Sequence, residues 1–122
     1  MGALALDASA MIALLHGDDS HHDRALTEFH ASSRREDSLL TSATAYSEIL
    51  VHAIREERGE LIKRFLERLK IEVVPVDKAI ARGAAELRVS HSFLRLPDAL
   101  VLATARARDA RLLTFDERLA QL

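Results

Sequence analysis

Four short runs of apolar residues stand out along the chain, and stretches with helical periodicity separate each run from the next. We predict strands at these runs: Ala3–Leu6, Ser38–Thr41, Glu72–Val76 and Arg111–Phe115. The runs do not alternate strictly between apolar and polar residues. This pattern is typical of strands that are buried on both faces of a parallel sheet.

The segments between the runs place apolar residues three or four positions apart, which is the spacing of one helix face. The predicted helices are Ala8–His16, Asp19–Arg35, Thr44–Glu57, Leu61–Leu69 after a break at Gly59, Lys78–His91, Asp98–Arg108 and a short helix after Asp116. Asp77 is the expected N-cap of the helix at Lys78. The Asp98–Arg108 segment is apolar on nearly every side, so we expect it to be buried, and Pro97 at its start favours a helix.

The alternation of strands and helices predicts an α/β fold with three layers, α/β/α, around a short parallel sheet of four to five strands. A chain of 122 residues has enough apolar surface for one core, so we expect a single domain over residues 1–122. Open parallel sheets bind their ligands at the carboxyl ends of the strands. The residues that follow the strands are therefore the first place to look for chemistry.

Composition removes several classes of protein. The chain has no Cys, which excludes a disulfide scaffold and a thiolate zinc site. We find no signal peptide and no membrane span in the sequence, so we expect a cytoplasmic protein without a membrane partner. The aromatic residues are four Phe and one Tyr. So few rings argue against a surface built for stacking bases.

Acidic residues follow the first and last predicted strands, at Asp7 and Asp116. Asp98 lies in the first turn of the buried helix, and Glu48 lies in the middle of another helix, on the same side as His52. Each acid also has a purely structural interpretation. Asp is a good N-cap, a carboxylate in a first turn compensates the helix dipole, and Glu48 fits a solvated face.

Taken together, four motifs resemble the PIN domains, specifically the short VapC-like toxins of bacterial and archaeal toxin–antitoxin pairs. The motifs are Leu6–Leu15, Ser47–Leu50, Leu96–Ala105 and Arg111–Asp116. The resemblance extends from Leu6 to Leu119, and no acid of the family pattern is missing.

The resemblance implies that four carboxylates converge in one pocket at the carboxyl end of the sheet: Asp7, Glu48, Asp98 and Asp116. It also implies that the Ser9 hydroxyl orients Asp7 or a metal-bound water. Thr114 stands two residues before Asp116, and its role is open between the site and the end of the strand.

Four ionised carboxylates in one pocket repel one another unless a cation neutralises them. Ligation by oxygen alone selects a hard ion, so Mg²⁺ or Mn²⁺ is expected, with one or two ions left open. Such an ion acidifies a bound water and neutralises phosphate charge, which supports hydrolysis of a phosphodiester bond. The histidines lack the spacing of metal ligands, and only His52, four residues after Glu48, stays open.

The net charge of −2 comes from 17 basic and 19 acidic residues. Without the four site acids the balance is 17 basic against 15 acidic, a net of +2. Arginines on the predicted helices are available for phosphate contacts: Arg34, Arg35, Arg55, Arg58, Arg64 and Arg68. We expect modest, salt-dependent affinity for RNA, with specificity from RNA shape or from a partner.

The resemblance therefore implies a toxin-type, metal-dependent endoribonuclease that is neutralised by a cognate antitoxin and forms a homodimer. Other interpretations remain. The same fold could be a non-catalytic interaction or RNA-binding module whose acids only cap helices. The pocket chemistry would serve a DNA nuclease equally well. A phosphoaspartate site at Asp7 is disfavoured, because Ser9 stands where a haloacid-type phosphatase has a second Asp.

Overall fold

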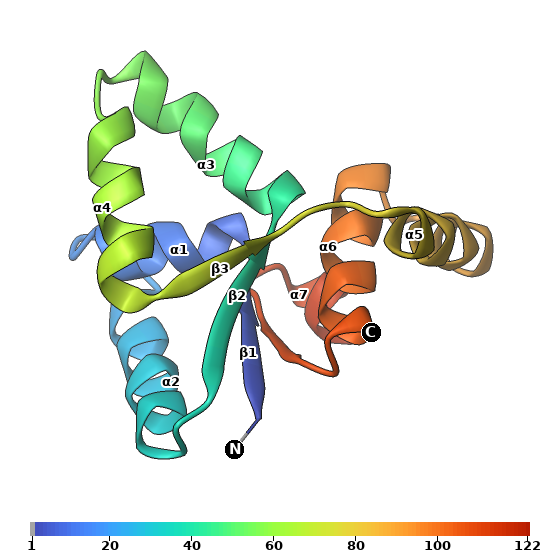
Figure 1. Cartoon of the computed structure of the whole chain (residues 1–122), viewed down its shortest axis with the longest axis horizontal. Coiled ribbons are helices and arrows are strands. Elements are labelled where there is room, and N and C mark those ends of the chain that lie inside the picture. The colour runs from blue at the N-terminus through green and yellow to red at the C-terminus, as the bar shows by residue number, and fades with distance from the viewer. Residues whose placement is uncertain (1) are drawn as a thin grey trace.

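One parallel sheet with helices on both faces forms the architecture of the computed structural model, which describes residues 2–122 (Figure 1). The strands are β1 (Ala3–Leu6), β2 (Ser38–Ser42), β3 (Ile71–Val74) and β4 (Arg111–Leu113). The helices are α1 (Ala8–Leu15), α2 (His22–Arg34), α3 (Ala43–Arg55), α4 (Gly59–Leu69), α5 (Lys78–Ser90), α6 (Leu96–Ala107) and α7 (Glu117–Ala120). The strand order is β3-β2-β1-β4, and all neighbours are parallel. The predicted α/β/α fold is confirmed, with four strands.

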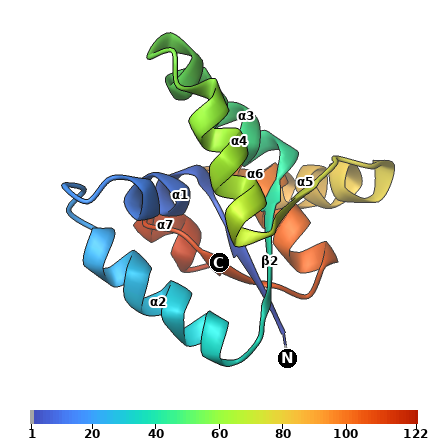
Figure 2. The same ribbon diagram turned by 60° about the vertical axis from the view of Figure 1, so that its left-hand side comes forward.

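Apolar side chains fill both faces of the sheet. Along β1, Leu4 and Leu6 enter the core that α1, α3 and α4 cover, whereas Ala5 enters the core that α5 and α6 cover. Figure 2 shows α5 and α6 on the other side of the strands from α1 and α2. Since both faces are covered, both sets of alternating side chains are apolar. This explains why the strands appear in the sequence as continuous apolar runs.

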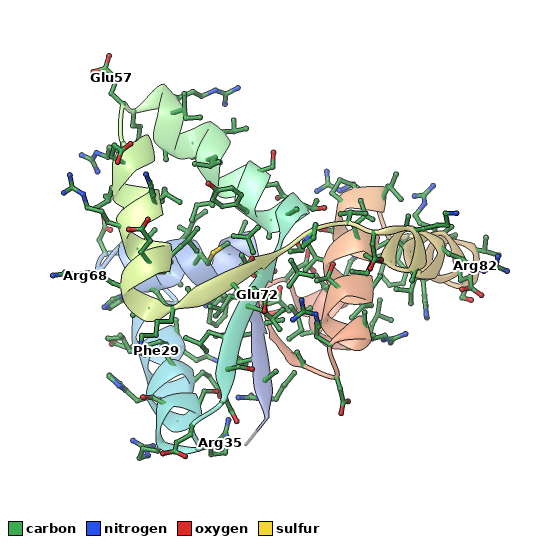
Figure 3. The ribbon with its side chains drawn as sticks, in the orientation of Figure 1. Phe29, Arg35, Glu57, Arg68, Glu72 and Arg82 are labelled. Carbon is green, nitrogen blue, oxygen red and sulfur yellow. The ribbon has the colours of Figure 1, made fainter. Side chains whose placement is uncertain are left out.

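The helix pair α3 and α4 forms a hairpin that projects beyond the rest of the chain (Figures 1 and 2). The sequence suggests a break at Gly59, but Gly59 is the first residue of α4. The chain reverses at Glu57 instead, which has a positive φ of 58° and lies at the tip of the hairpin (Figure 3). A non-glycine residue in this region is strained. The backbone N–H of Arg58, which donates to the carbonyl of Ala53 at 2.6 Å, holds the turn.

Two strands are displaced from their predicted ends for identifiable reasons. β3 runs from Ile71 to Val74, because Pro75 has no N–H to donate to the sheet. β4 stops at Leu113, and the N–H of Phe115 donates to the Ser9 hydroxyl at 3.0 Å instead of to a strand. The end of β4 therefore belongs to the surroundings of Asp7.

α2 and α6 also begin away from their predicted first residues. α2 begins at His22 rather than at Asp19, because Asp19 forms a turn in which its carbonyl accepts from the His22 N–H. α6 begins at Leu96, two residues before Asp98, with Pro97 in its first turn. The predicted N-cap at Asp77 is confirmed, with its side chain accepting from Ile80 N–H.

The carboxyl ends of β1, β2 and β4 lie at one edge of the sheet. Leu6 pairs with Leu113, and the Thr41 hydroxyl donates to the Leu6 carbonyl at 2.6 Å. Asp7 and Thr114, which follow the paired residues directly, are thereby brought together. Within residues 2–122, no helix has the length and apolar character needed to cross a membrane.

Candidate active site

Asp7 is a buried carboxylate held by three hydrogen bonds. It caps α1, with Oδ1 accepting from the Ala10 N–H at 2.9 Å and from the Ser9 hydroxyl at 2.6 Å. Oδ2 accepts a hydrogen bond from the Thr114 hydroxyl. Only 7 % of the residue is exposed to solvent. Asp7 is therefore fixed in one orientation by two groups of α1 and by the hydroxyl of Thr114, which follows β4.

Two hydroxyl groups connect Asp7 to the turn that carries Asp116. Thr114 Oγ1 accepts from the Asp116 N–H at 3.1 Å while its own proton goes to Asp7. Ser9 Oγ likewise donates to Asp7 and accepts from the Phe115 N–H. Both hydroxyls use donor and acceptor together, so the positions of the two acids are coupled.

Burial raises the pKa of Asp7 above its ordinary value, even though the hydrogen bonds from Ser9, Thr114 and Ala10 act in the opposite direction. The negative charge of Asp116 adds to the increase. Removal from water disfavours a charged carboxylate, and a neighbouring acid disfavours it further. The hydrogen bonds to Asp7 therefore compensate only in part for the free-energy cost of burying its negative charge.

Asp77 provides an internal comparison for Asp7. Both residues are N-caps with nearly the same backbone angles, φ −85° and ψ 179° for Asp7 against φ −89° and ψ 179° for Asp77. Both accept a hydrogen bond from the backbone N–H three residues later. Asp77 is exposed, whereas Asp7 is buried and accepts two more hydrogen bonds from side chains. Capping a helix therefore does not account for the surroundings of Asp7.

Glu48, on α3, is electrostatically coupled to two of the other acids. The residue as a whole is exposed, but partial burial of its carboxyl raises its pKa. The negative charges of Asp98 and Asp7 raise this pKa further. The positive charge of Arg95 acts in the opposite direction. Its exposed position agrees with the structural interpretation of a solvated face, and the negative charges of Asp98 and Asp7 nevertheless raise its pKa.

Asp98 and Asp116 line one pocket of about 270 Å³. Asp98 lies in the first turn of α6, with Oδ2 3.7 Å from Arg95 Nε. Asp116 is exposed and caps α7, where Oδ1 accepts from the N–H groups of Arg118 and Leu119. Asp7 and Asp116 both cap helices, as their structural interpretation holds, and they follow β1 and β4 at the carboxyl edge of the sheet.

The four acids therefore form a chain of coupled charges. Hydrogen bonds through Thr114 join Asp7 and Asp116, a pocket joins Asp98 and Asp116, and charge repulsion joins Glu48 to Asp7 and Asp98. Within residues 2–122, no three acidic or histidine side chains are gathered closely enough to hold a metal ion as they stand. The donor set, carboxylate oxygens alone, suits a hard divalent cation.

His52 does not join the acids. It lines a separate pocket of about 300 Å³ between α1, α3 and α4, together with His16 and apolar residues that include Ile12 and Ile49. No residue of that pocket is one of the four acids. The spacing of His52 from Glu48 therefore reflects one turn of α3 and not a shared position at the edge of the sheet.

Residues 4–122 match the family model of the PIN domain. The chain belongs to the PIN-domain family. No curated protein matches this PIN domain.

Solved structures with the same fold are similar to this PIN domain over nearly its whole length. A toxin–antitoxin complex from Klebsiella pneumoniae has a TM-score of 0.76 and 23% identity, over 95% of this chain and 88% of that chain. VapC20 from Mycobacterium tuberculosis, described as a sarcin-ricin loop cleaving toxin, has a TM-score of 0.72 and 19% identity, over 98% of this chain and 94% of that chain. VapBC2 from Rickettsia felis, in a structure bound to a DNA fragment from its promoter, has a TM-score of 0.77 and 16% identity, over 99% of this chain and 92% of that chain. At these identities the likeness establishes the fold.

Two arginines at the site of the PIN domain are absent from the set that the sequence suggested. Arg95 and Arg118 line the pocket that holds Asp98 and Asp116. The arginines that the sequence suggested lie on or next to α2, α3 and α4, and Figure 3 shows two of them, Arg35 and Arg68, away from α5 and α6. Arg95 and Arg118 could have been found in the sequence by their proximity to the acids of the motifs, since each lies within three residues of Asp98 or Asp116.

The raised pKa of Asp7 predicts a pH-dependent effect of Asp7→Asn on the metal-free PIN domain. The folded state binds a proton more tightly than the unfolded chain, so stability decreases as pH rises from the ordinary value of 3.8 through the higher pKa of the folded state. At pH 7 in EDTA, we expect Asp7→Asn to raise the melting temperature by about 4 °C, equivalent to about 1 kcal/mol. At pH 3.5 this gain should disappear.

Thermal melting at several pH values measures this effect, and Asp77→Asn is the matched control, because Asn also caps helices well. The control should melt within about 1 °C of the wild type at every pH, since the effect on an exposed cap is small. A lower melting temperature for Asp7→Asn at pH 7 would show that its hydrogen bonds outweigh the cost of burying its charge.

Proposed function

We propose that this PIN domain is a toxin-type endoribonuclease that depends on Mg²⁺ or Mn²⁺ and uses Asp7, Glu48, Asp98 and Asp116 as its metal-binding acids. The observation that carries the proposal is the position of Asp7. It is buried, it is held by two side-chain hydroxyls, and it is close enough to Asp116 and Glu48 for their charges to interact. Such a group of mutually repelling acids is favourable once a cation joins it.

The chemistry of the site supports a hard divalent ion. All four side chains offer oxygen, and Mg²⁺ and Mn²⁺ prefer oxygen ligands. Asp7 has a fixed orientation, Asp116 is held by its cap on α7 with Oδ2 outside that cap, and Glu48 is exposed at the surface of α3. When bound, a divalent ion supplies a more acidic water and neutralises charge on the phosphate that is attacked.

The chain's own residues have distinct roles in this proposal. Ser9 and Thr114 each donate a hydrogen bond to Asp7, which favours its ionised form and aligns its carboxylate. Asp116 uses Oδ1 to cap α7, and Oδ2 remains for a ligand. Asp98 pairs loosely with Arg95, and Glu48 comes from α3, where the negative charges of Asp98 and Asp7 act on it. We assign Glu48 to a second ion or to a water.

The proposed partners follow from the related structures. Solved structures with this fold include toxin–antitoxin complexes from Klebsiella pneumoniae and Rickettsia felis, which supports a cognate antitoxin that silences this chain. VapC20 is described as cleaving the sarcin-ricin loop, which supports RNA as the substrate. We propose a homodimer in the cytoplasm as the active form.

The alternative function is a non-catalytic interaction or RNA-binding module, which is favoured by the observation that Asp7 and Asp116 do cap helices. The comparison with Asp77 distinguishes the two functions. A cap alone requires neither burial nor two additional hydroxyl donors, and Asp77 caps α5 without either. A module of this kind would bind its partner equally well with and without Mg²⁺.

Cleavage of labelled nucleic acids by the purified protein tests the proposed function. We expect single-stranded RNA to be cut in Mg²⁺ or Mn²⁺ and to remain intact in EDTA, whereas a DNA strand of the same sequence is cut much more slowly. Preferential cutting of DNA would show that the substrate is DNA and not RNA, and the metal-dependent mechanism would still hold. Equal cutting in EDTA would contradict the metal-dependent mechanism, and no cutting under any condition would favour the binding module.

A further inference from the structure

Phe93 is exposed in the pocket that holds two of the acids. Among the exposed large apolar side chains of residues 2–122 it is the only aromatic one, with 45% of its surface accessible. It belongs to the loop between α5 and α6 and lines the pocket together with Asp98 and Asp116. Leaving such a ring in water forgoes the stabilisation that burial would give. This position therefore suggests a ligand that covers the ring.

The loop that carries Phe93 is fixed in place. Leu94 is buried, its carbonyl accepts from Arg88 Nη1 at 2.7 Å, and its N–H donates to the His91 carbonyl at 3.0 Å. The His91 ring meets the Phe93 ring edge to face, with centroids 6.1 Å apart. Because the loop is ordered by its neighbours, little conformational entropy is lost when a ligand contacts the ring.

Two guanidinium groups accompany the ring. The Arg118 guanidinium lies 5.6 Å from the centroid of Phe93, and within residues 2–122 Arg118 forms no ion pair. Arg95 is 80% exposed at its side chain and pairs only loosely with Asp98, at 3.7 Å. Both therefore keep donors available for an anion. Guanidinium groups match the geometry of phosphate oxygens, and aromatic rings stack on nucleobases.

We infer that this pocket is a nucleotide subsite, in which a base of single-stranded RNA stacks on Phe93 while Arg118 and Arg95 bind a phosphate next to the bond that is cleaved. The choice of RNA as the ligand rests on the proposed function. Every base has an aromatic face, so the subsite selects an unpaired nucleotide and not a particular base. The small number of aromatic residues argued against stacking, but one ring in this position is sufficient for one nucleotide.

Binding of two fluorescein-labelled probes tests the inference by fluorescence anisotropy in EDTA at low salt. One probe is a single-stranded RNA of twelve nucleotides, and the other is the same sugar-phosphate backbone without bases. Because EDTA suppresses metal-dependent cleavage, binding is measured independently of nuclease activity. The wild-type protein should bind the RNA at least about fivefold more tightly than the abasic probe, as expected for one stacked base.

Substitutions of Phe93 and of Arg118 should act differently on the two probes. Phe93→Ala and Phe93→Leu should bind both probes with equal affinity, because the stacking surface is lost. Arg118→Ala should weaken both probes about equally, by severalfold, because it removes a phosphate contact. The matched controls lie outside the pocket. Val89→Ala changes an 87% exposed residue of α5, and Arg82→Ala changes an exposed residue in the second turn of α5, on the outer side of the molecule (Figure 3). Neither should change the binding of either probe.

Failure of the inference is distinct from failure of the proposed function. Phe93→Ala that still prefers the RNA probe, or wild type that shows no preference, overturns the subsite even if the protein cleaves RNA. A base preference that Phe93→Ala abolishes supports the subsite even if no cleavage occurs in Mg²⁺ or Mn²⁺. Analytical ultracentrifugation tests whether Phe93 contacts a second subunit instead of a base. If Phe93→Ala dissociates a dimer and keeps the base preference, the ring is a subunit contact and the inference is wrong.

Discussion

Asp7→Asn is expected to reduce the rate of RNA cleavage by at least about 10³-fold, equivalent to about 4 kcal/mol of transition-state stabilisation, while the protein stays folded. Asn retains the size of the side chain and the ability to cap α1, but it loses the negative charge and one of two acceptor oxygens. Because Asp7 is the buried member of the coupled acids, no exposed neighbour can take its place. Single-turnover cleavage of one labelled RNA in Mg²⁺ measures the effect.

Asp77→Asn is the control for this experiment, because it changes the same residue type in the same capping geometry outside the site. It should cleave RNA at a rate within about twofold of the wild type, as expected for an exposed substitution away from the site. Circular dichroism and melting in EDTA verify that both variants fold. If Asp7→Asn cut RNA as fast as Asp77→Asn, the acid would be a helix cap only, and the proposed site would be wrong.

Mg²⁺ or Mn²⁺ is expected to stabilise the wild-type protein strongly, and Asp98→Asn should remove most of that stabilisation. Binding to the folded state alone adds about 2.7 kcal/mol at a hundredfold excess over the dissociation constant, which for a domain of this size raises the melting temperature by about 10 °C. Asp98 lies in the first turn of α6, so its loss also weakens a favourable interaction with the helix dipole, by about 0.3–1 kcal/mol. The comparison is therefore the metal-induced shift of each variant and not its absolute melting temperature.

The same melting series in Ca²⁺ tests a third divalent ion, EDTA gives the metal-free baseline, and Asp77→Asn should show the full wild-type shift. An equal shift in Asp98→Asn and in wild type would place the ion elsewhere on the surface. The absence of any shift with each of the three ions would mean that the acids do not form one site.

The sequence could predict the layers of this fold because both faces of each strand are apolar. All side chains of a run such as Ala3–Leu6 are apolar and favour burial, and in the structure this strand lies between two groups of helices. The ends of elements depended on individual groups that periodicity does not describe. Pro75 ends β3 for lack of an N–H, and Asp19 delays α2 by forming a turn.

The four acids that we propose as the site each stand in a motif that can be recognised in the sequence. What the sequence could not give is the set of contacts between distant positions. The Thr114 hydroxyl reaches Asp7 across 107 positions of chain, and only the pairing of β1 with β4 brings the two residues together. The pocket that gathers Arg95, Arg118 and Phe93 likewise depends on how α6, α7 and the loop before α6 are packed.

The structural and functional interpretations of the acids are compatible with each other. Asp7 and Asp116 cap α1 and α7 and also lie at the carboxyl edge of the sheet. A strand that ends in a helix N-terminus places a capping carboxylate at the edge where parallel sheets bind ligands. One residue can therefore start a helix with one oxygen and offer the other to a ligand.

The most direct test of the account is a titration of the purified protein with Mn²⁺, followed by the electron paramagnetic resonance signal of the free ion. The wild-type protein and Asp77→Asn should each take up one or two Mn²⁺ per chain, whereas Asp7→Asn and Asp98→Asn should leave the ion in solution. Wild-type protein that binds no Mn²⁺, or an Asp7→Asn variant that binds as much as the wild type, would contradict the claim that these carboxylates form a metal site.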